Sequence, residues 1–506
     1  MSLINESAIK TPGVYVTEID AFPPSIAQVD TIPAFVGYTQ KAFDPNAKNL
    51  PVDGNGNNLI NIPTQITSLL DYETYFGTAQ LETGLTITID QTTDANDNLL
   101  TEKITPAFTA GKQSNHTMHA AIRFFYDNGG GKCYIVSIAP YKANVGDALV
   151  PGDFTAGLEA VKKEDDITLI IFPEGQKLPA DTDLYTLQSS ALNLCADTNL
   201  QDRFCILDLY NTGESVKTSN DLTTATTAFR SNIAPTLDES LNYGAAYFPN
   251  LISKYSFSID GTTTALTQNV SKNGAPPAAG PFNGHHLSEL NNALTGDLGL
   301  YNRIESVLNN QFPMVMPPSP AIAGIYCSVD ATRGIWKAPA NVAVQSIIGP
   351  ACKISDEMQA DMNVDPATGK SINAIRSFTG KGTLVWGGRT LLGNDNNWRY
   401  ISVRRFYIMV EKSVKLAAFR FVFEPNDANT WVRVRAMIEN YLTNLWRLGA
   451  LAGAKPEQAF FVRVGLGLTM TFDDVLNGKL IIEIGMAPVR PAEFIILRFT
   501  QIQQTS

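Results

Sequence analysis

Short apolar runs alternate with helical stretches through the middle of the chain. Between the runs, apolar residues recur at helical spacing near residues 154–163, 183–196 and 221–233. Strands that alternate with helices imply right-handed crossovers and a mostly parallel sheet. The pattern therefore predicts an α/β domain whose buried strands lie at residues 31–38, 133–138, 167–173, 203–209 and 243–251.

Two polar segments interrupt this pattern. Residues 84–112 contain two alternating runs around an Asp/Asn-rich turn at 93–98, which predicts a surface β-hairpin. Residues 256–284 are polar and rich in Gly, Pro and Ala, which indicates a second external loop or hairpin. Helical patterning is present at 66–76, 116–127 and 287–308.

The C-terminal part of the chain is organised around one amphipathic helix. Phe421-Val422-Phe423 predicts a short strand that Pro425 ends, and Asp427 is a good helix N-cap. We expect the helix to span residues 429–447 and Gly449 to end it. Its core face should consist of the apolar residues at helical spacing, which are Trp431, Val434, Ile438, Tyr441, Leu442 and Leu445.

Both chain ends carry strand-like segments that have no local partner. Residues 11–20 alternate like a strand and are followed by Pro23-Pro24. Residues 479–484 and 493–500 are also strand-like, and Pro488 and Pro491 separate them. The segment 493–500 is apolar on both faces, which is a liability unless another chain covers it. Pairing with a second chain is favoured, although a strand within the same chain remains an alternative.

Composition and charge limit the classes of function. The 506 residues suffice for several domains, and the net charge of -11 argues against general binding of nucleic acids or anionic membranes. An uncharged stretch at 308–329 contains four prolines and cannot be a membrane helix. Residues 398–447, with nine basic and four acidic residues, carry +5. This block suggests one surface that meets an acidic partner, with ordinary solvated charges or nucleic-acid binding as alternatives.

No residue set completes a catalytic, cofactor or metal site. Gly129-Gly130-Gly131-Lys132 lacks the remainder of a phosphate loop and predicts a helix-to-strand turn. His116 and His119 lack further ligands at metal-site spacing. The five scattered cysteines are typical of buried thiols in a protein made in a reducing cytoplasm, and the N-terminus has no secretion signal. The alternating pattern leaves an α/β enzyme of unknown substrate as the main competing class.

Several long segments resemble the contractile tail sheath family, which includes the sheaths of phage tails and of phage-like injection particles. They occur in the order expected for that family, together with TPGVYVTEI near the N-terminus. The segments are RGIWKAPAN (333–341), IRSFTGKGTLVWGGRTL (375–391), WRYISVRRFYIMVEKS (398–413), FEPNDANTWVRVRAMIENYLTNLW (423–446) and GKLIIEIGMAPVRPAEFIILRFTQ (478–501).

The resemblance implies a structural subunit with no catalytic site, cofactor or metal. Such subunits polymerise as helical hexameric rings around an inner tube, and contraction drives the tube through a target envelope. The expected partners are further copies of the chain, the inner tube protein, the baseplate, and the tail-terminator or cap proteins, with no nucleic acid and no membrane insertion. The protein would be made in the cytoplasm and become part of a phage tail or phage-like particle.

The resemblance also assigns domains and contact residues. It implies an N-terminal arm (1–20), an inner domain formed by 21–80 and 346–489, a surface β insertion (81–115), a central and outer α/β domain (116–345) and a C-terminal arm (490–506). Strand exchange between subunits would use Val14, Tyr15, Val16, Ile19, Leu480, Ile482, Phe494, Ile496 and Arg498. With the local charge, it points to Arg433, Arg435 and Lys455 as tube-facing residues.

Overall fold

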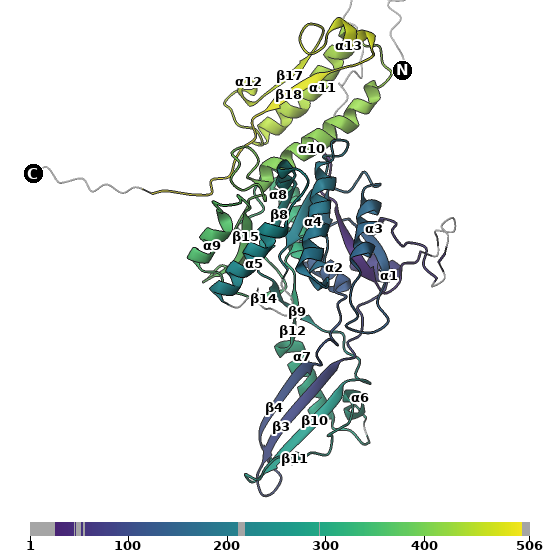
Figure 1. Cartoon of the computed structure of the whole chain (residues 1–506), viewed down its shortest axis with the longest axis vertical. Helices are drawn as coiled ribbons and strands as arrows, with labels where there is room; N and C mark the ends of the chain where they lie inside the picture. The colour runs from purple at the N-terminus through teal and green to yellow at the C-terminus, as the bar shows by residue number, and fades with distance from the viewer. Residues whose placement is uncertain are drawn as a thin grey trace, which may run out of the picture. The chain divides into compact units, whose positions relative to one another are not determined.

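The chain forms two compact units in a computed structural model, which describes residues 26–44, 46, 52–53, 56–210, 218–292 and 294–497. The α/β unit comprises residues 30–408 and 490–506. The C-terminal unit comprises residues 409–489 together with 1–29. Figure 1 shows the elements of each unit, coloured from purple at the N-terminus to yellow at the C-terminus.

A nine-stranded sheet forms the centre of the α/β unit, in the order β13-β16-β15-β8-β7-β6-β1-β5-β2. Its middle strands are parallel and almost wholly buried, so the mostly parallel sheet predicted from the apolar runs is confirmed. They are β5 (Cys133–Pro140), β1 (Pro33–Thr39), β6 (Leu169–Ile171), β7 (Phe204–Asp208) and β8 (Gly244–Phe248). Around them lie β15 (Ile372–Phe378), parallel to β8, and the antiparallel strands β16 (Gly382–Val385), β13 (Val342–Ala343) and β2 (Thr64–Ile66).

Helices connect successive parallel strands and cover both faces of the sheet. From β1 to β5 the chain moves across the sheet in one direction. From β5 through β6, β7 and β8 it moves across the sheet in the opposite direction. Right-handed crossovers therefore place α2 on the face opposite to α3 and α4. A further helix, α8, packs against α2. The helices are α1 (Leu69–Phe76), α2 (Met118–Asp127), α3 (Pro151–Val161), α4 (Asp181–Ala196), α5 (Ser219–Asn232) and α8 (Ser319–Arg333).

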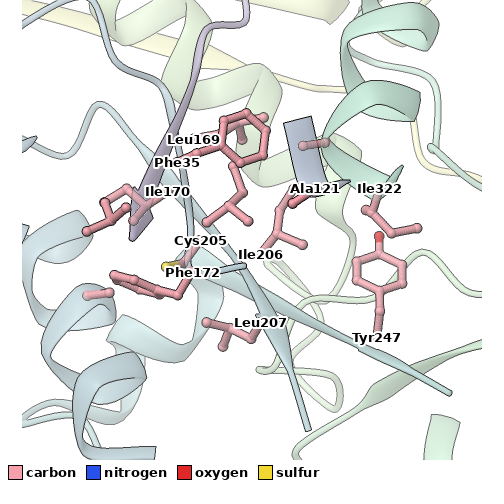
Figure 2. Packing of buried hydrophobic residues seen from close by; sticks show 14 of the residues in the cluster. Phe35, Ala121, Leu169, Ile170, Phe172, Cys205, Ile206, Leu207, Tyr247 and Ile322 are labelled. Carbon is pink, nitrogen blue, oxygen red and sulfur yellow. The ribbon is translucent and has the colours of Figure 1, made fainter. Parts of the chain in front are cut away.

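The core of the unit lies between this sheet and its helices. Figure 2 shows Phe35, Leu169 and Ile206 of the sheet beside Ala121 of α2 and Ile322 of α8. All five are buried, with at most 1 % of each exposed. Burial of a side chain of this size contributes about 1.5–3 kcal/mol, so this core accounts for much of the stability of the unit.

The two polar insertions form one separate layer. The predicted hairpin is present as the antiparallel pair β3 and β4, and β10 joins β3 in parallel to give the order β11-β10-β3-β4. Helices α6 and α7 bury apolar side chains against β3 and β10, which gives this layer its own core. Figure 1 shows α6 and α7 beside the sheet of β11, β10, β3 and β4. The elements are β3 (Leu85–Thr93), β4 (Leu99–Phe108), β10 (Ala265–Lys272), β11 (Ala278–Ala279), α6 (Leu287–Leu290) and α7 (Leu298–Gln311).

A smaller sheet and one more helix complete the α/β unit. The sheet is three-stranded, in the order β12-β9-β14, and both of its outer strands run antiparallel to β9. Its strands are β12 (Pro313–Met316), β9 (Leu251–Ser256) and β14 (Ile347–Pro350), and the helix is α9 (Asp356–Asn363).

The C-terminal unit is built on two long helices and a two-stranded sheet. The predicted strand at 421–423 is wrong. Helix α10 continues to Ala418, the turn η5 (Phe419–Phe421) follows, and Val422 and Phe423 are exposed and belong to no strand. Alternation of apolar residues resembles a strand even where no second strand is present to pair with it. The other elements are α10 (Ile401–Ala418), α11 (Ala428–Arg447), α12 (Pro456–Ala459), β17 (Phe460–Val464), α13 (Phe472–Leu476) and β18 (Ile482–Met486).

The division into units differs from the domain boundaries expected at residues 80 and 345. β1 and β2 lie in the nine-stranded sheet together with β15 and β16, because β1 pairs with β5 and β15 pairs with β8. Residues 30–80 and 346–408 therefore fold with the α/β unit. The described residues 490–497 also belong to the α/β unit and not to the unit that directly precedes them in sequence.

Candidate assembly surfaces

The predicted C-terminal helix is present as α11, and its polar face carries the expected arginines. Asp427 caps it by accepting a hydrogen bond from the Thr430 backbone N–H at 2.9 Å. The guanidinium of Arg433 lies 3.1 Å from Glu424, and that of Arg435 lies 2.8 Å from Glu439 one turn along the helix. The buried face consists of Thr430, Val434, Met437, Ile438, Tyr441, Leu442 and Leu445. Trp431, which was predicted for this face, is only half-buried.

Arg433 and Arg435 are available to a partner. Their side chains are 56 % and 53 % exposed, and exposed ion pairs of this kind contribute only about 0–1 kcal/mol. Lys455 is also exposed but follows the opposite end of α11, where the Trp446 indole N–H donates to the Gly453 carbonyl. At 1.5 Å per residue, Arg433 and Trp446 lie about 20 Å apart along the helix axis, so Lys455 does not form one patch with the two arginines.

The basic block at 398–447 is not one surface, so that expectation is wrong. Arg404, Arg405 and Lys412 are 3–6 % exposed. Arg405 forms a buried ion pair with Asp330, and Arg404 lies over the rings of Tyr243 and Trp398. Net charge along a sequence does not distinguish a buried arginine that pairs in the interior from one that faces solvent.

The two-stranded sheet of the C-terminal unit has an open edge on β18. β17 and β18 pair antiparallel from Phe460↔Met486 to Val464↔Ile482 without a register shift. The Ala487 N–H bonds the Ala459 carbonyl, so by the alternation of an antiparallel ladder the backbone groups of Ile482 and Ile484 point away from β17. No third strand joins this sheet from the described residues. Of the two predicted receiving residues, Ile482 is the first residue of β18, and Leu480 precedes the strand.

The predicted C-terminal arm is only partly described. Residues 494–497 are exposed, with 68–79 % of each side chain accessible, and they belong to no strand of this chain. These residues include Phe494 and Ile496. Arg498 and the N-terminal arm residues Val14, Tyr15, Val16 and Ile19 lie outside the described residues.

Two further groups of exposed apolar side chains lie in the C-terminal unit. One follows α10 and comprises Leu416, Phe419, Val422 and Phe423. The other surrounds α13 and comprises Leu466, Leu468, Phe472 and Leu476. This much exposed apolar surface is typical of protein–protein contact. Analysis of the sequence did not identify either group, because the same residue types would also suit a core.

The place where an α/β enzyme would bind a ligand is filled. In chain order the parallel strands are arranged 2-1-3-4-5, and sheets of this order bind ligands beside the first strand, at the carboxyl ends. There the fully buried Glu174, just after β6, accepts the backbone N–H groups of Tyr38 at 2.7 Å and Thr117 at 3.0 Å. Thr117 is the N-cap residue of α2, so this carboxylate stabilises the N-terminus of a helix.

A second buried carboxylate has a similar role. Asp208 ends β7 and accepts hydrogen bonds from the backbone N–H and the hydroxyl of Ser319, the first residue of α8. Complete burial raises the pKa of Asp208 to about 7, and the two hydrogen bonds from Ser319 oppose this rise. Both oxygens of the carboxylate bond α8, so Asp208 is not presented to a substrate.

The histidines and the glycine-rich turn have local structural partners. His116 accepts the Lys142 backbone N–H on Nε2, and His119 lies 3.0 Å from Glu73. No group of three metal-ligating side chains is present among the described residues. Gly129 has a positive φ of 89° between α2 and β5, as expected for a turn, and Lys132 pairs with Asp30. In the described part of the chain, no helix combines the length and apolar character of a membrane span.

Comparison with known proteins gives matches to sheath proteins of contractile phage tails and related particles. The family model of the phage tail sheath C-terminal domain matches residues 393–502. The tail sheath protein of Vibrio phage KVP40 is 26 % identical over 185 residues, which are 36 % of this chain. The alignment spans only 26 % of the length of that phage protein.

Two solved structures match almost the whole chain. A chain of the anti-feeding prophage helical sheath in the contracted state is 29 % identical with a TM-score of 0.60, over 97 % of this chain and 99 % of that one. A chain of the anti-feeding prophage baseplate, solved with six-fold symmetry, is 28 % identical with a TM-score of 0.59, over 98 % and 100 %. With the motifs and the fold, these matches show that the C-terminal part of the chain resembles the phage tail sheath C-terminal domain and that the whole chain is similar to contractile tail sheath proteins, which are structural components of phage tails or phage-like particles.

Proposed function

We propose that the chain is a sheath subunit that polymerises as helical hexameric rings around an inner tube. Contraction of the sheath would drive the tube through a target cell envelope. The structural relatives support this proposal, because one is the subunit of a helical sheath in a contracted state and another belongs to a six-fold baseplate. Further partners of the sheath would be the baseplate and the tail-terminator or cap proteins.

The observation that carries the proposal is a pair of complementary, incomplete elements. β18 offers the backbone groups of Ile482 and Ile484 at an open edge. Residues 494–497 offer an exposed apolar segment that belongs to no strand of its own chain. An extended segment that joins the open edge of a neighbour satisfies both. Strand exchange of this kind keeps subunits linked while their other interfaces rearrange.

The N-terminal arm would take part in the same exchange, through Val14, Tyr15, Val16 and Ile19. We place the inner tube against α11, where Arg433 and Arg435 are exposed on the polar face. Exposed arginines fit an acidic surface on the tube protein. Lys455, which follows the opposite end of α11, would make a separate contact. Contraction in this scheme draws on alternative packings of the subunits and requires no nucleotide.

The proposal is tested by truncation after Glu493, which removes Phe494 to Ser506. We expect a soluble monomer with an unchanged circular dichroism spectrum that forms no sheath. The described apolar residues that the truncation removes, Phe494 to Leu497, are exposed, so we expect the fold not to depend on them. Sedimentation and negative-stain microscopy measure assembly. Striated, contractile tubes formed by the truncated chain would show that the C-terminal arm is not the link.

A further inference from the structure

A built carboxylate site holds the C-terminal segment where it enters the α/β unit. The guanidinium of Arg389 contacts both oxygens of Glu493, with Nη2 at 2.7 Å from Oε2 and Nε at 2.9 Å from Oε1. The amide of Asn363 donates to Oε1 at 2.7 Å, and the hydroxyl of Tyr400 donates to Oε2 at 3.3 Å. Two-point contact between Arg and a carboxylate is strong and directional.

The arginine of this site is fixed by its own neighbours. Its side chain is only 5 % exposed, and its Nη1 donates to the carbonyl of Gly393 at 3.1 Å. Its backbone N–H and carbonyl both bond the side chain of Asn373 in β15. Arg389 and Asn363 hold the pKa of Glu493 below its usual value, so the carboxylate is ionised at neutral pH.

In the described part of its segment, Glu493 makes the polar contacts to the α/β unit. Among described residues 490–497, the hydrogen bonds and ion pairs to the rest of the α/β unit all involve Glu493. Upstream, the Val489 N–H still bonds Ala450 of the C-terminal unit. Downstream, Phe494 to Leu497 are exposed. The segment is therefore held at a single residue, directly before its apolar part begins.

We propose that the Arg389–Glu493 contact positions the C-terminal arm by fixing its starting point on the α/β unit, so that the arm is presented to a second copy of the chain in one place. This inference rests on the proposed strand exchange. When the contact is made, Phe494 lies one residue, about 3.8 Å, from a fixed point. Without it, the last fixed residue is Val489, and a flexible segment of five residues spans about 12 Å on average.

The larger volume that an unanchored arm can occupy sets the expected rise in the critical concentration for sheath assembly. The volume open to the start of the arm scales with the cube of its distance from the last fixed residue, and the cube of the ratio of the two distances is about 30. Loss of the contact therefore lowers the effective concentration of the arm at the open edge of the neighbouring subunit by at most about 30-fold. Residual stiffness at Pro491 lowers this limit. We therefore expect release of Glu493 to raise the critical concentration for sheath assembly by about tenfold.

The test replaces Glu493 by Gln, which keeps the size of the side chain and removes its charge. The matched control is Glu102→Gln in β4, because Glu102 also makes a two-point contact with an arginine, Arg303, at 2.7 and 3.1 Å. Both full-length variants lose one Arg–carboxylate pair, and Glu493→Gln should lose more Tm because Arg389 is buried and Arg303 is half-exposed, so assembly of both is compared well below their Tm values. Only Glu493→Gln should raise the critical concentration for sheath assembly.

A milder variant covers the case in which Glu493→Gln folds poorly. Asn363→Ala removes one donor to Glu493 and leaves Arg389 paired, so we expect a smaller rise in the critical concentration. The proposal is overturned if Glu493→Gln assembles at the wild-type concentration, or if Glu102→Gln raises it equally. Truncation after Glu493 distinguishes failure of this inference from failure of the proposed function, because sheath formation by the truncated chain would refute strand exchange itself.

Discussion

A proline placed on the open edge of β18 should block assembly without damaging the sheet. Ile484 pairs with Val462, and its N–H points away from β17 by the alternation of the ladder. Ile484→Pro removes this outward donor and no hydrogen bond inside the hairpin, and proline is tolerated on an edge strand in this position. The neighbour's segment would then lose one backbone hydrogen bond and face a proline ring.

The expected loss of association follows from the free energy that one backbone hydrogen bond contributes. A backbone hydrogen bond contributes about 0.5–1.5 kcal/mol net, which corresponds to a loss of about 2- to 13-fold in the association constant of each joint. Ile484→Ala is the matched control, because it also removes the half-buried side chain but keeps the N–H. We expect the critical concentration of Ile484→Pro to exceed that of Ile484→Ala by at least this factor.

The assay measures critical concentration by sedimentation of purified protein over a concentration series, with negative-stain microscopy of the pellets. Thermal unfolding of the monomers checks the fold. Glu483→Pro is a second control, because the N–H of Glu483 bonds Arg463 within the hairpin by the same alternation, so its monomer should lose Tm. Equal critical concentrations for Ile484→Pro and Ile484→Ala would refute the assignment of this edge as the receiving strand.

Three further predictions concern charge. Reversal of Arg433 and Arg435 to Glu should abolish co-sedimentation of sheath with tube and change monomer stability by no more than about 1 kcal/mol per ion pair; attachment that persists at raised salt would place the tube contact elsewhere. Asp330→Asn leaves the buried Arg405 without its counter-ion and should cost about 3–5 kcal/mol in the free energy of unfolding by urea titration; a loss below 1 kcal/mol would contradict this. The folded-state pKa of Asp208, about 7, exceeds its ordinary value of 3.8, so its contribution to stability is complete below pH 4 and is lost as pH rises to 7; Asp208→Asn should flatten this decline in urea midpoints between pH 5 and 7.5.

The periodic parts of the sequence determined their own structure. The apolar runs that became β1, β5, β6, β7 and β8 are buried on both faces, so their composition alone specifies central strands. Most of the buried face of α11 was also predictable, because its apolar residues recur at helical spacing over about four turns and Asp427 caps its start. The hairpin of β3 and β4 was predictable from its alternating strands and polar turn.

Pairing between distant segments was decided only by the tertiary structure. β10 pairs with β3 across more than 170 residues, and β15 adds to β8 across more than 120 residues. Alternation in one strand shows which residues share a face but contains no information about which other strand lies beside it. The domain boundaries expected at residues 80 and 345 therefore differ from the units that the structure forms.

The tertiary structure also decided which charged side chains are buried and which are exposed. Arg404 and Arg405 looked like part of a basic surface and are buried against aromatic rings and Asp330, whereas Arg433 and Arg435 are exposed as expected. Glu493 carries no sequence signal that distinguishes it from other acids, because its site is formed by residues about 90 to 130 positions earlier in the chain. Sequence by itself indicated most of the periodic local elements and the resemblance to contractile tail sheath proteins, and only the folded chain determined which charges meet, because burial and distance depend on the packing of segments that are far apart in sequence.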